Sequence, residues 1–157
     1  MQKITPFLWF EKDAMKVAQY YCSIFKESKI KNSRVLNNTP SGSVEIVTIE
    51  LFGQDFTLMS AGPLFKFTEA ISFIVDCQDQ QEVDYYWNKL TADGGEESMC
   101  GWLKDKYGLS WQVTPKQLNI LMGDKDKEKA GRVMQAMLKM KKIDIKKLEQ
   151  AYDGKNV

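Results

Sequence analysis

The chain has 157 residues, of which 43% are hydrophobic and 27% charged, the composition of an ordinary globular protein of one domain. Its 22 basic and 21 acidic side chains leave a formal charge of +1, so no bulk charge favours binding to nucleic acid or to an anionic membrane. The sequence contains no histidine, which excludes Ser–His–Asp and Cys–His nucleophilic pairs and every His-ligated metal site.

Residues 5–60 are predicted to form a strand, a helix and three further strands. Thr5–Phe10 is a run of apolar and β-prone residues, and Asp13 is placed to cap the helix that follows it. The helix is indicated by apolar residues that recur every three or four positions, namely Ala14, Val17, Ala18, Tyr21, Cys22 and Phe25. Strands follow near Ile30–Leu36, at Val44–Leu51 and at Phe56–Ser60, with a loop at 37–42 and a turn at 53–55.

Residues 70–115 repeat that order after a linker. Ala70–Cys77 is predicted as a strand, and Asp79 with Glu82 forms a capping signal for a second helix. That helix ends at Gly94-Gly95, where glycine supplies a residue with positive φ. Two strands are expected next, near Glu97–Lys104 and Leu109–Val113, joined by a turn at 105–108.

The two passes superimpose when the sequence is shifted by 65 positions. The shift places Tyr20-Tyr21 on Tyr85-Tyr86 in the helices, and Leu8 on Phe73 in the first strands. Because the apolar phase is kept in both strand and helix, an internal duplication is favoured over chance agreement of two amphipathic helices. The sequence therefore predicts an α+β fold of two β-α-β-β-β modules.

Residues 116–157 are predicted to form a helical tail. Thr114–Gln117 has the pattern of a capping box with proline at the first helical position, and Asp124 and Asp144 are expected to begin two further helices. The middle helix has an apolar stripe, interpreted as core or dimer packing, of Ala130, Val133, Met134, Met137 and Leu138. The expected organisation is a single domain, 1–157, with module one at about 1–61, a linker at 62–69, module two at 70–115 and the tail at 116–157.

Cysteine usage and the opening residues predict a cytoplasmic protein. Cys22, Cys77 and Cys100 are widely spaced and form no CxxC pair, so neither a zinc knuckle nor a thioredoxin-like motif is indicated. The first six residues lack the apolar segment of a signal peptide. Apolar runs also fall short of the roughly 18 residues that span a bilayer, so no membrane partner is expected.

One stretch carries a resemblance to a known family. Residues 100–105 read Cys-Gly-Trp-Leu-Lys-Asp and residues 108–112 read Gly-Leu-Ser-Trp-Gln. With residues 4–10, 82–87 and 140–144, they resemble the PhnB-like branch of the glyoxalase/bleomycin-resistance/dioxygenase (vicinal oxygen chelate) superfamily, whose domain is named 3-demethylubiquinone-9 3-methyltransferase. The resemblance implies paired βαβββ modules with curved, mixed sheets around a small-molecule cavity, usually in a homodimer.

The sequence departs from metal-dependent members of that superfamily, which place ligands on the first and last strand of each module. Here those strands contain no His, Asp or Glu, and Gln112 is at best a weak oxygen ligand; they are Pro6–Phe10, Phe56–Ser60, Ile71–Val75 and Ser110–Thr114. A Rossmann-type methyl-donor site needs a Gly-rich turn between a strand and a helix, whereas Gly94-Gly95 follows a helix. We therefore predict no metal and no cofactor.

The candidate ligand site is an apolar cavity with few polar groups. Trp102 and Trp111 lie on neighbouring strands and are expected to contribute one wall, although alternation puts Trp111 and Gln112 on opposite faces. Phe65 and Phe67 in the linker are expected either to cover the cavity or to fill the seam between the modules. The lining candidates, each with a core position as its alternative, are Trp9, Met59, Phe65, Phe67, Trp102, Trp111 and Gln112.

Two side chains are candidates for catalysis. Glu50 shares a strand face with Ile46 and Thr48, so it is either a cavity carboxylate that serves as a base or, as we favour, a solvated residue at a strand end. Cys100 is either a nucleophile that needs a nearby cation, such as Lys104 or Lys106, or, again favoured, an inert thiol.

Three functions follow from this pattern. The first is a metal-independent protein that binds a small, largely apolar or aromatic molecule, as drug-resistance relatives do, and that forms a homodimer. The second is an enzyme acting on an aromatic or quinone-like substrate, as the family name implies, with Glu50 or Cys100 in the reaction. The third is a dimeric domain whose cavity is filled by its own side chains. The sequence does not decide whether the protein is an enzyme.

Overall fold

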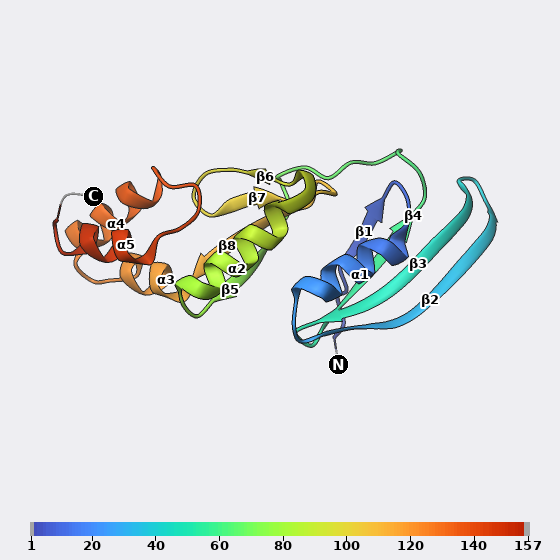
Figure 1. The fold of residues 1–157 in the computed structure, drawn as a ribbon, viewed down its shortest axis with the longest axis horizontal. Coiled ribbons are helices and arrows are strands. Elements are labelled where there is room, and N and C mark those ends of the chain that lie inside the picture. The colour runs from blue at the N-terminus through green and yellow to red at the C-terminus, as the bar shows by residue number, and fades with distance from the viewer. Residues whose placement is uncertain (1, 156–157) are drawn as a thin grey trace. The chain divides into compact units, whose positions relative to one another are not determined.

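The structure is a computed structural model that describes residues 2–155. The chain divides into two compact units, Met1–Phe67 and Thr68–Val157, and each unit contains one four-stranded sheet (Figure 1). The division lies inside the predicted linker. No helix in the described part of the chain is both long and apolar enough to cross a membrane.

The first unit has the predicted order of elements: β1 (Phe7–Phe10), α1 (Ala14–Ile24), β2 (Ser28–Thr39), β3 (Gly42–Leu51) and β4 (Gln54–Ser60). Its strands are ordered β1-β4-β3-β2, with β1 parallel to β4 and the other neighbours antiparallel. Helix α1 packs on β3 and β4, and every second strand residue is buried beneath it. These buried strand residues are Leu8, Phe10, Val47, Ile49, Leu51, Phe56 and Leu58.

The second unit repeats the arrangement with β5 (Ser72–Cys77), α2 (Gln80–Thr91), a short 3-10 turn (Ala92–Gly94), β6 (Glu96–Glu97), β7 (Trp102–Lys104) and β8 (Ser110–Pro115). Its order, β5-β8-β7-β6, again has one parallel pair, β5 with β8, and antiparallel pairs elsewhere. The α+β fold of two βαβββ modules is confirmed.

The predicted duplication is visible in matching elements. β1 begins at Phe7 and β5 at Ser72, which are 65 positions apart. In each module a tyrosine pair lies on the helix with one ring buried, and the ring centroids are 5.4 Å apart for Tyr20 and Tyr21 and 5.1 Å apart for Tyr85 and Tyr86.

The two predicted helix caps differ in geometry. Asp79 accepts a hydrogen bond from the Glu82 amide at 2.9 Å, and the Glu82 carboxylate accepts one from the Gln78 amide, as a capping box requires. Asp13 occupies the N-cap of α1 but makes no side-chain capping bond there, since its backbone is left-handed, with φ of 57°. Its carboxylate pairs with Lys16 instead.

The largest departure from the expected strands is at β2 and β3. The segment predicted as a loop at 37–42 belongs mostly to these strands, which are joined by a turn at Pro40-Ser41. β2 is an edge strand that is exposed over most of its twelve residues. Because both faces of such a strand are exposed, it contains many polar residues, and its sequence resembles that of a loop.

The tail forms three helices, α3 (Lys116–Met122), α4 (Lys127–Met137) and α5 (Ile145–Tyr152). Asp144 caps α5 as predicted, by accepting from the Lys147 amide. Two expected caps are wrong: Thr114 is still in β8, opposite Asp76, and α4 is capped by Asp126 rather than Asp124. The tail has its own core of Leu118, Leu121, Val133, Met140, Ile143 and Leu148.

The apolar stripe predicted for α4 is narrower than expected. Val133 is fully buried, and Met137 packs against the core of the tail. Met134 and Leu138 are 39% and 48% exposed, so they lie outside that core. The same periodic pattern therefore contains both buried and exposed positions.

Candidate functional site

Each sheet has one face that its own helix covers and one that no helix of its module covers, here called the open face. In the first unit, register places Trp9, Met59 and Ile46 side by side on the open face. Trp9 and Met59 are partly buried and pack against a small cluster of Val44, Ile46 and Ala61. Thr48 and Thr57, which pair in the same sheet, add hydroxyl groups to this face.

The indole of Trp9 is held in place at the edge of the sheet. Its Nε1 donates to the carbonyl oxygen of Gly62 at 2.8 Å, and the ring of Phe65 meets it edge-on at a centroid distance of 4.9 Å. Phe67 packs instead against Phe10, at 5.2 Å, and Phe10 belongs to the face that α1 covers. The predicted pair is therefore divided, with only Phe65 beside the open face.

The open face of the second unit carries Trp102, Gln112 and Ile74, which are in register on β7, β8 and β5. The Gln112 amide donates to the hydroxyl of Ser72 at 2.8 Å. Ile74 is exposed, whereas Trp102 and Gln112 are partly buried. This face combines one indole with neutral hydrogen-bonding groups, the mixture typical of small-molecule sites.

Trp111 lies on the opposite face, so the expectation that Trp102 and Trp111 form one wall is corrected. β7 and β8 pair Leu103 with Trp111, which turns Trp111 toward α2. Its indole is 3% exposed and donates to Asp105 at 2.8 Å. Trp111 is a core side chain.

Glu50 lies at the end of β3 within a group of charges. Its carboxylate contacts Lys29 at 3.0 Å and Lys31 at 3.7 Å, and Lys31 also pairs with Asp55 at 2.9 Å. The structure thus places Glu50 on the same side of β3 as Ile46 and Thr48. Its carboxylate, however, forms ion pairs with the ammonium groups of the two lysines. This is an ordinary ion-pair arrangement at a strand end.

Cys100 lies in the connection between β6 and β7, where its backbone is left-handed with φ of 59°. The two lysines that were candidates to stabilise its thiolate contact other groups. Lys104 pairs with Glu69 at 2.5 Å, and the ammonium of Lys106 lies 5.5 Å from the ring centroid of Tyr107. This arrangement gives no support to an activated thiolate.

The three thiols differ in environment. Burial raises the pKa of Cys77 to about 12, with neighbouring carboxylates adding to the effect, and burial also raises the pKa of Cys22. Cys100 is partly exposed.

We expect N-ethylmaleimide at pH 8 to modify Cys100 long before Cys77, because the Cys77 thiol is buried and the rise of its own pKa from 9.0 to about 12 lowers its thiolate fraction about a thousandfold. Peptide mass spectrometry of the timed reaction measures this. In 6 M guanidinium chloride the difference should vanish. Equal native rates would contradict the buried, protonated state of Cys77.

The superfamily's metal position is not matched by the residues here. The open faces consist mainly of apolar, aromatic, hydroxyl and amide side chains, whereas a divalent ion needs several converging charged or imidazole ligands. Their carboxylates do not converge: Glu50 and Asp55 are paired with lysines in the first sheet, and Asp76 belongs to the second. Within residues 2–155, no group of three or more Cys, Asp or Glu is placed to hold a metal ion. A Rossmann-type methyl-donor turn is also unmatched, since Gly94-Gly95 follows α2.

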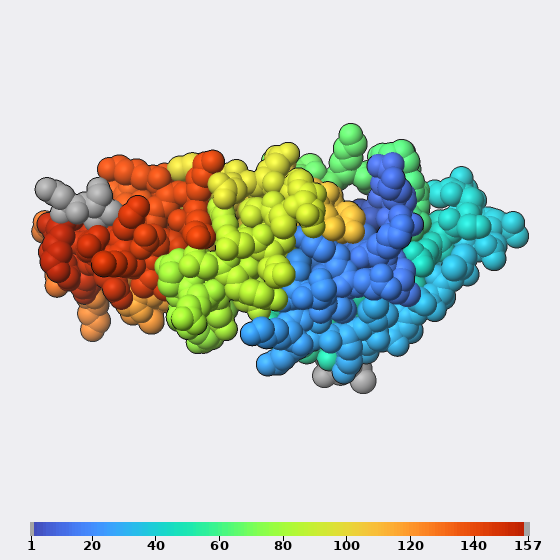
Figure 2. Space-filling model, viewed as in Figure 1, coloured from blue at the N-terminus to red at the C-terminus, as the bar shows by residue number. Residues whose placement is uncertain are grey.

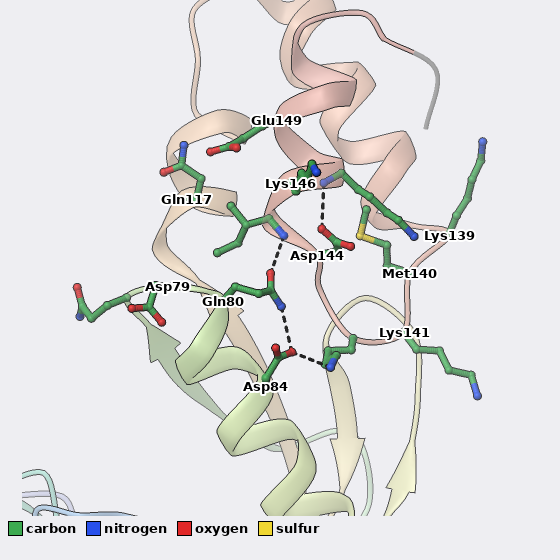
Figure 3. Close-up of a pocket in the computed structure, with 14 residues that line it drawn as sticks. Asp79, Gln80, Asp84, Gln117, Lys139, Met140, Lys141, Asp144, Lys146 and Glu149 are labelled. Atoms are coloured by element: carbon green, nitrogen blue, oxygen red, sulfur yellow. Dashed lines mark hydrogen bonds and ion pairs between the residues drawn. The ribbon is translucent and has the colours of Figure 1, made fainter.

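A feature that the sequence analysis missed is a polar groove of about 1190 Å³ between α2 and the tail (Figure 3). Gln80 and Asp84 of α2 line it on one side. Five lysines of the tail line it as well, namely Lys139, Lys141, Lys142, Lys146 and Lys147. The lysine-rich stretch at 139–147 was a signal for it, but periodicity alone does not show that this stretch faces α2.

Comparison with known proteins places the chain in a family. The family model for 3-demethylubiquinone-9 3-methyltransferase matches residues 2–114. The structure of a PhnB protein from Bacillus cereus is 34% identical, with a TM-score of 0.65, over 73% of this chain and 99% of that one. No curated protein matches the sequence.

More distant structures share the fold. The fosfomycin resistance protein FosX from Listeria monocytogenes is 18% identical, with a TM-score of 0.57, over 76% of this chain and 94% of that one. Another structure of FosX contains Mn(II). A glyoxalase family protein from Bacillus cereus is 10% identical, with a TM-score of 0.52, over 73% of this chain and 93% of that one. The chain belongs to the 3-demethylubiquinone-9 3-methyltransferase family, like the Bacillus cereus PhnB protein, and it shares its fold with FosX and the glyoxalase family protein.

Proposed function

We propose that the protein binds a small, largely apolar or aromatic molecule on the open faces of its sheets, without a metal ion. The observation that carries this proposal is the division of the four tryptophans. Trp87 and Trp111 are 2% and 3% exposed, and each donates its indole N–H to a carboxylate, Glu97 and Asp105 respectively. Trp9 and Trp102 lie on the open faces and are only partly buried.

An indole that its own module leaves partly uncovered offers a large apolar surface to a ligand. The side chains in register with these indoles on the neighbouring strands are neutral. Gln112 and Ser72 are able to donate to a carbonyl or hydroxyl oxygen, while Met59 and Ile46 provide apolar contact. On the second face, Lys104 lies two residues from Trp102 but is already paired with Glu69, so a neutral ring with a few oxygen atoms fits best.

The family name supports a quinone-like ring in particular, because demethylated ubiquinone is an oxygenated six-membered ring. The same name favours a second candidate, an enzyme acting on such a ring. That function needs a methyl donor bound by a mode other than a Rossmann-type turn, and a reactive group other than the ion-paired Glu50. We further propose that the protein acts as a homodimer in the cytoplasm.

The binding proposal predicts that Trp9→Ala and Trp102→Ala each weaken binding of duroquinone, a fully substituted neutral quinone, by about tenfold. The loss reflects the apolar and stacking contact that each indole provides. Equilibrium dialysis measures the dissociation constant directly, without relying on the fluorescence of the mutated residue.

Val35→Ala is the control, since Val35 is exposed on β2 in register with Glu45 and therefore lies on the other side of that sheet from Trp9. It should leave the dissociation constant unchanged. The proposal is wrong if both tryptophan variants bind duroquinone as the unaltered protein does. Native mass spectrometry of freshly purified protein that showed one tightly held transition-metal ion per chain would overturn its metal-independent part.

A further inference from the structure

The helical tail, which includes residues 140–144 of the resemblance noted in the sequence, lies beyond the residues that the family model matches. The family match ends at residue 114, and the Bacillus cereus PhnB protein is covered almost completely by 73% of this chain. The tail nevertheless packs closely on the module before it, as its orange and red atoms against the yellow-green atoms show (Figure 2). It therefore needs an explanation beyond the family fold.

Charge contributes to this attachment. Residues 68–115 contain three basic and nine acidic side chains, a net charge of −6, whereas residues 116–157 contain eleven and six, a net charge of +5. Two ion pairs join the oppositely charged parts, Lys142 with Asp84 at 2.6 Å and Lys141 with Glu97 at 3.5 Å. Since exposed pairs contribute little each, charge alone does not fix the geometry.

Backbone hydrogen bonds fix it instead. The amides of Cys100 and Gly101 donate to the carbonyl oxygens of Met140 and Lys141, at 2.7 and 2.8 Å. The carbonyl of Gly101 in turn accepts from the amide of Val113 in β8, at 2.8 Å. The connection before β7 is thus held between the sheet and the tail.

That connection leads directly into Trp102. The Trp102 amide donates to Met99 at 3.0 Å and its carbonyl accepts from Ser98 at 2.9 Å, so residues 98–102 form a closed turn. Trp102 is the first residue of β7 and carries the indole of the open face. A displacement of Gly101 would move that indole.

Gln80 connects α2 to the same part of the tail. Its side chain donates to the carbonyl of Ile143 at 3.0 Å and accepts from the amide of Ile145 at 2.9 Å. It also donates to Asp84, as Figure 3 shows, and Lys142 contacts the same carboxylate. Hydrogen bonding from Lys142, with a smaller contribution from Gln80, holds the pKa of Asp84 below its usual range.

The main chain beside these contacts is anchored in the core of the tail. Ile143 is completely buried and Met140 nearly so, and both belong to that core. Gln80 therefore binds the main chain at residues 143 and 145 of a segment that Met140 and Ile143 anchor in the core of the tail. Two or three residues before Ile143, the carbonyls of Met140 and Lys141 accept from the amides of residues 100–101.

We propose that Gln80 is a positioning residue which, through the tail segment 140–145, holds Trp102 in the orientation needed to bind a small aromatic ligand. The inference rests on the proposed function, since it assigns a role to the indole of the second open face. Gln80 does not touch the ligand.

The test compares Gln80→Ala with Gln81→Ala, which removes an exposed glutamine from the same turn of the same helix. The four indole N–H signals are recorded in ¹H–¹⁵N spectra, with that of Trp102 identified by its loss in Trp102→Phe. For Gln80→Ala we expect the Trp102 signal to shift or broaden while that of Trp111, whose indole donates to Asp105, stays, and duroquinone to bind about fivefold more weakly. Gln81→Ala should change neither.

A milder variant, Lys142→Ala, keeps the test decisive if Gln80→Ala folds poorly, and it should move the same signal by a smaller amount. An unchanged Trp102 signal in both variants overturns the proposal. So does a shifted signal with unchanged duroquinone affinity, because a merely structural contact would behave in that way. If Trp102→Ala itself leaves the affinity unchanged, the proposed function of that face fails, and this result is distinct from a failure of the Gln80 variants alone.

Discussion

Asp105→Ala is expected to lower the free energy of unfolding by about 3 kcal/mol. The Asp105 side chain is 2% exposed and accepts hydrogen bonds from the amides of Tyr107 and Leu109, at 2.8 and 3.2 Å, and from the indole of Trp111 at 2.8 Å. Alanine would leave buried donors without acceptors and a void beside the indole. Urea unfolding followed by tryptophan fluorescence measures the change.

Two further substitutions test whether the loss of stability comes from the buried hydrogen bonds of Asp105. Asp76→Ala removes an exposed carboxylate from β5 of the same sheet and is expected to change stability by less than about 0.5 kcal/mol. Asp105→Asn keeps the shape and one acceptor oxygen, but it turns an amide donor toward a donor partner, so we expect an intermediate loss. A cost for Asp105→Ala as small as that of Asp76→Ala would mean that the turn at 105–108 does not depend on this carboxylate.

The modules were predictable because both of their periodicities are strong. α1 and α2 repeat their apolar residues at helical spacing, and the strands beneath them alternate, so the duplication is visible without coordinates. The connection between β2 and β3 was predicted too long, as a loop at 37–42 instead of a turn at 40–41, because β2 buries almost nothing. Backbone hydrogen bonds to the neighbouring strand, rather than buried apolar residues, determine where an exposed edge strand ends. Those hydrogen bonds leave no pattern of apolar residues in the sequence.

The site was predictable only in part, because a strand face depends on register. Trp102 and Trp111 both lie on strands of one hairpin, as predicted, but their faces follow from the pairing of Leu103 with Trp111. That pairing is set by the Asp105–Leu109 turn, whose amide–carbonyl bond is 2.9 Å. The link from Gln80 to the tail joins residues about 65 positions apart, and no local pattern indicates it.

The contact between the tail and the connection before β7 leads to a paired prediction at two glycines. Gly101 and Gly108 have nearly the same positive φ, 82° and 83°. A Cβ at Gly108 would meet nothing within 4 Å, whereas one at Gly101 would lie 2.9 Å from the carbonyl oxygen of Val113 and 3.1 Å from Cγ1 of Ile143. Alanine at either position is strained by a similar amount, because both positions have a left-handed φ. Only Gly101→Ala also brings the new Cβ too close to the sheet and to the tail.

We therefore expect Gly108→Ala to lower the free energy of unfolding by about 1 kcal/mol, from strain alone, and Gly101→Ala by about 3 kcal/mol. Urea unfolding of the two variants measures the difference directly, because the strain common to both cancels. Because Val113 is inside β8, an alanine at 101 would have to move away from its carbonyl oxygen, and Ile143 with the tail would have to give way. Equal losses for the two variants would show that the tail yields freely at this contact, and a tail that yields there could not hold Trp102 in one orientation.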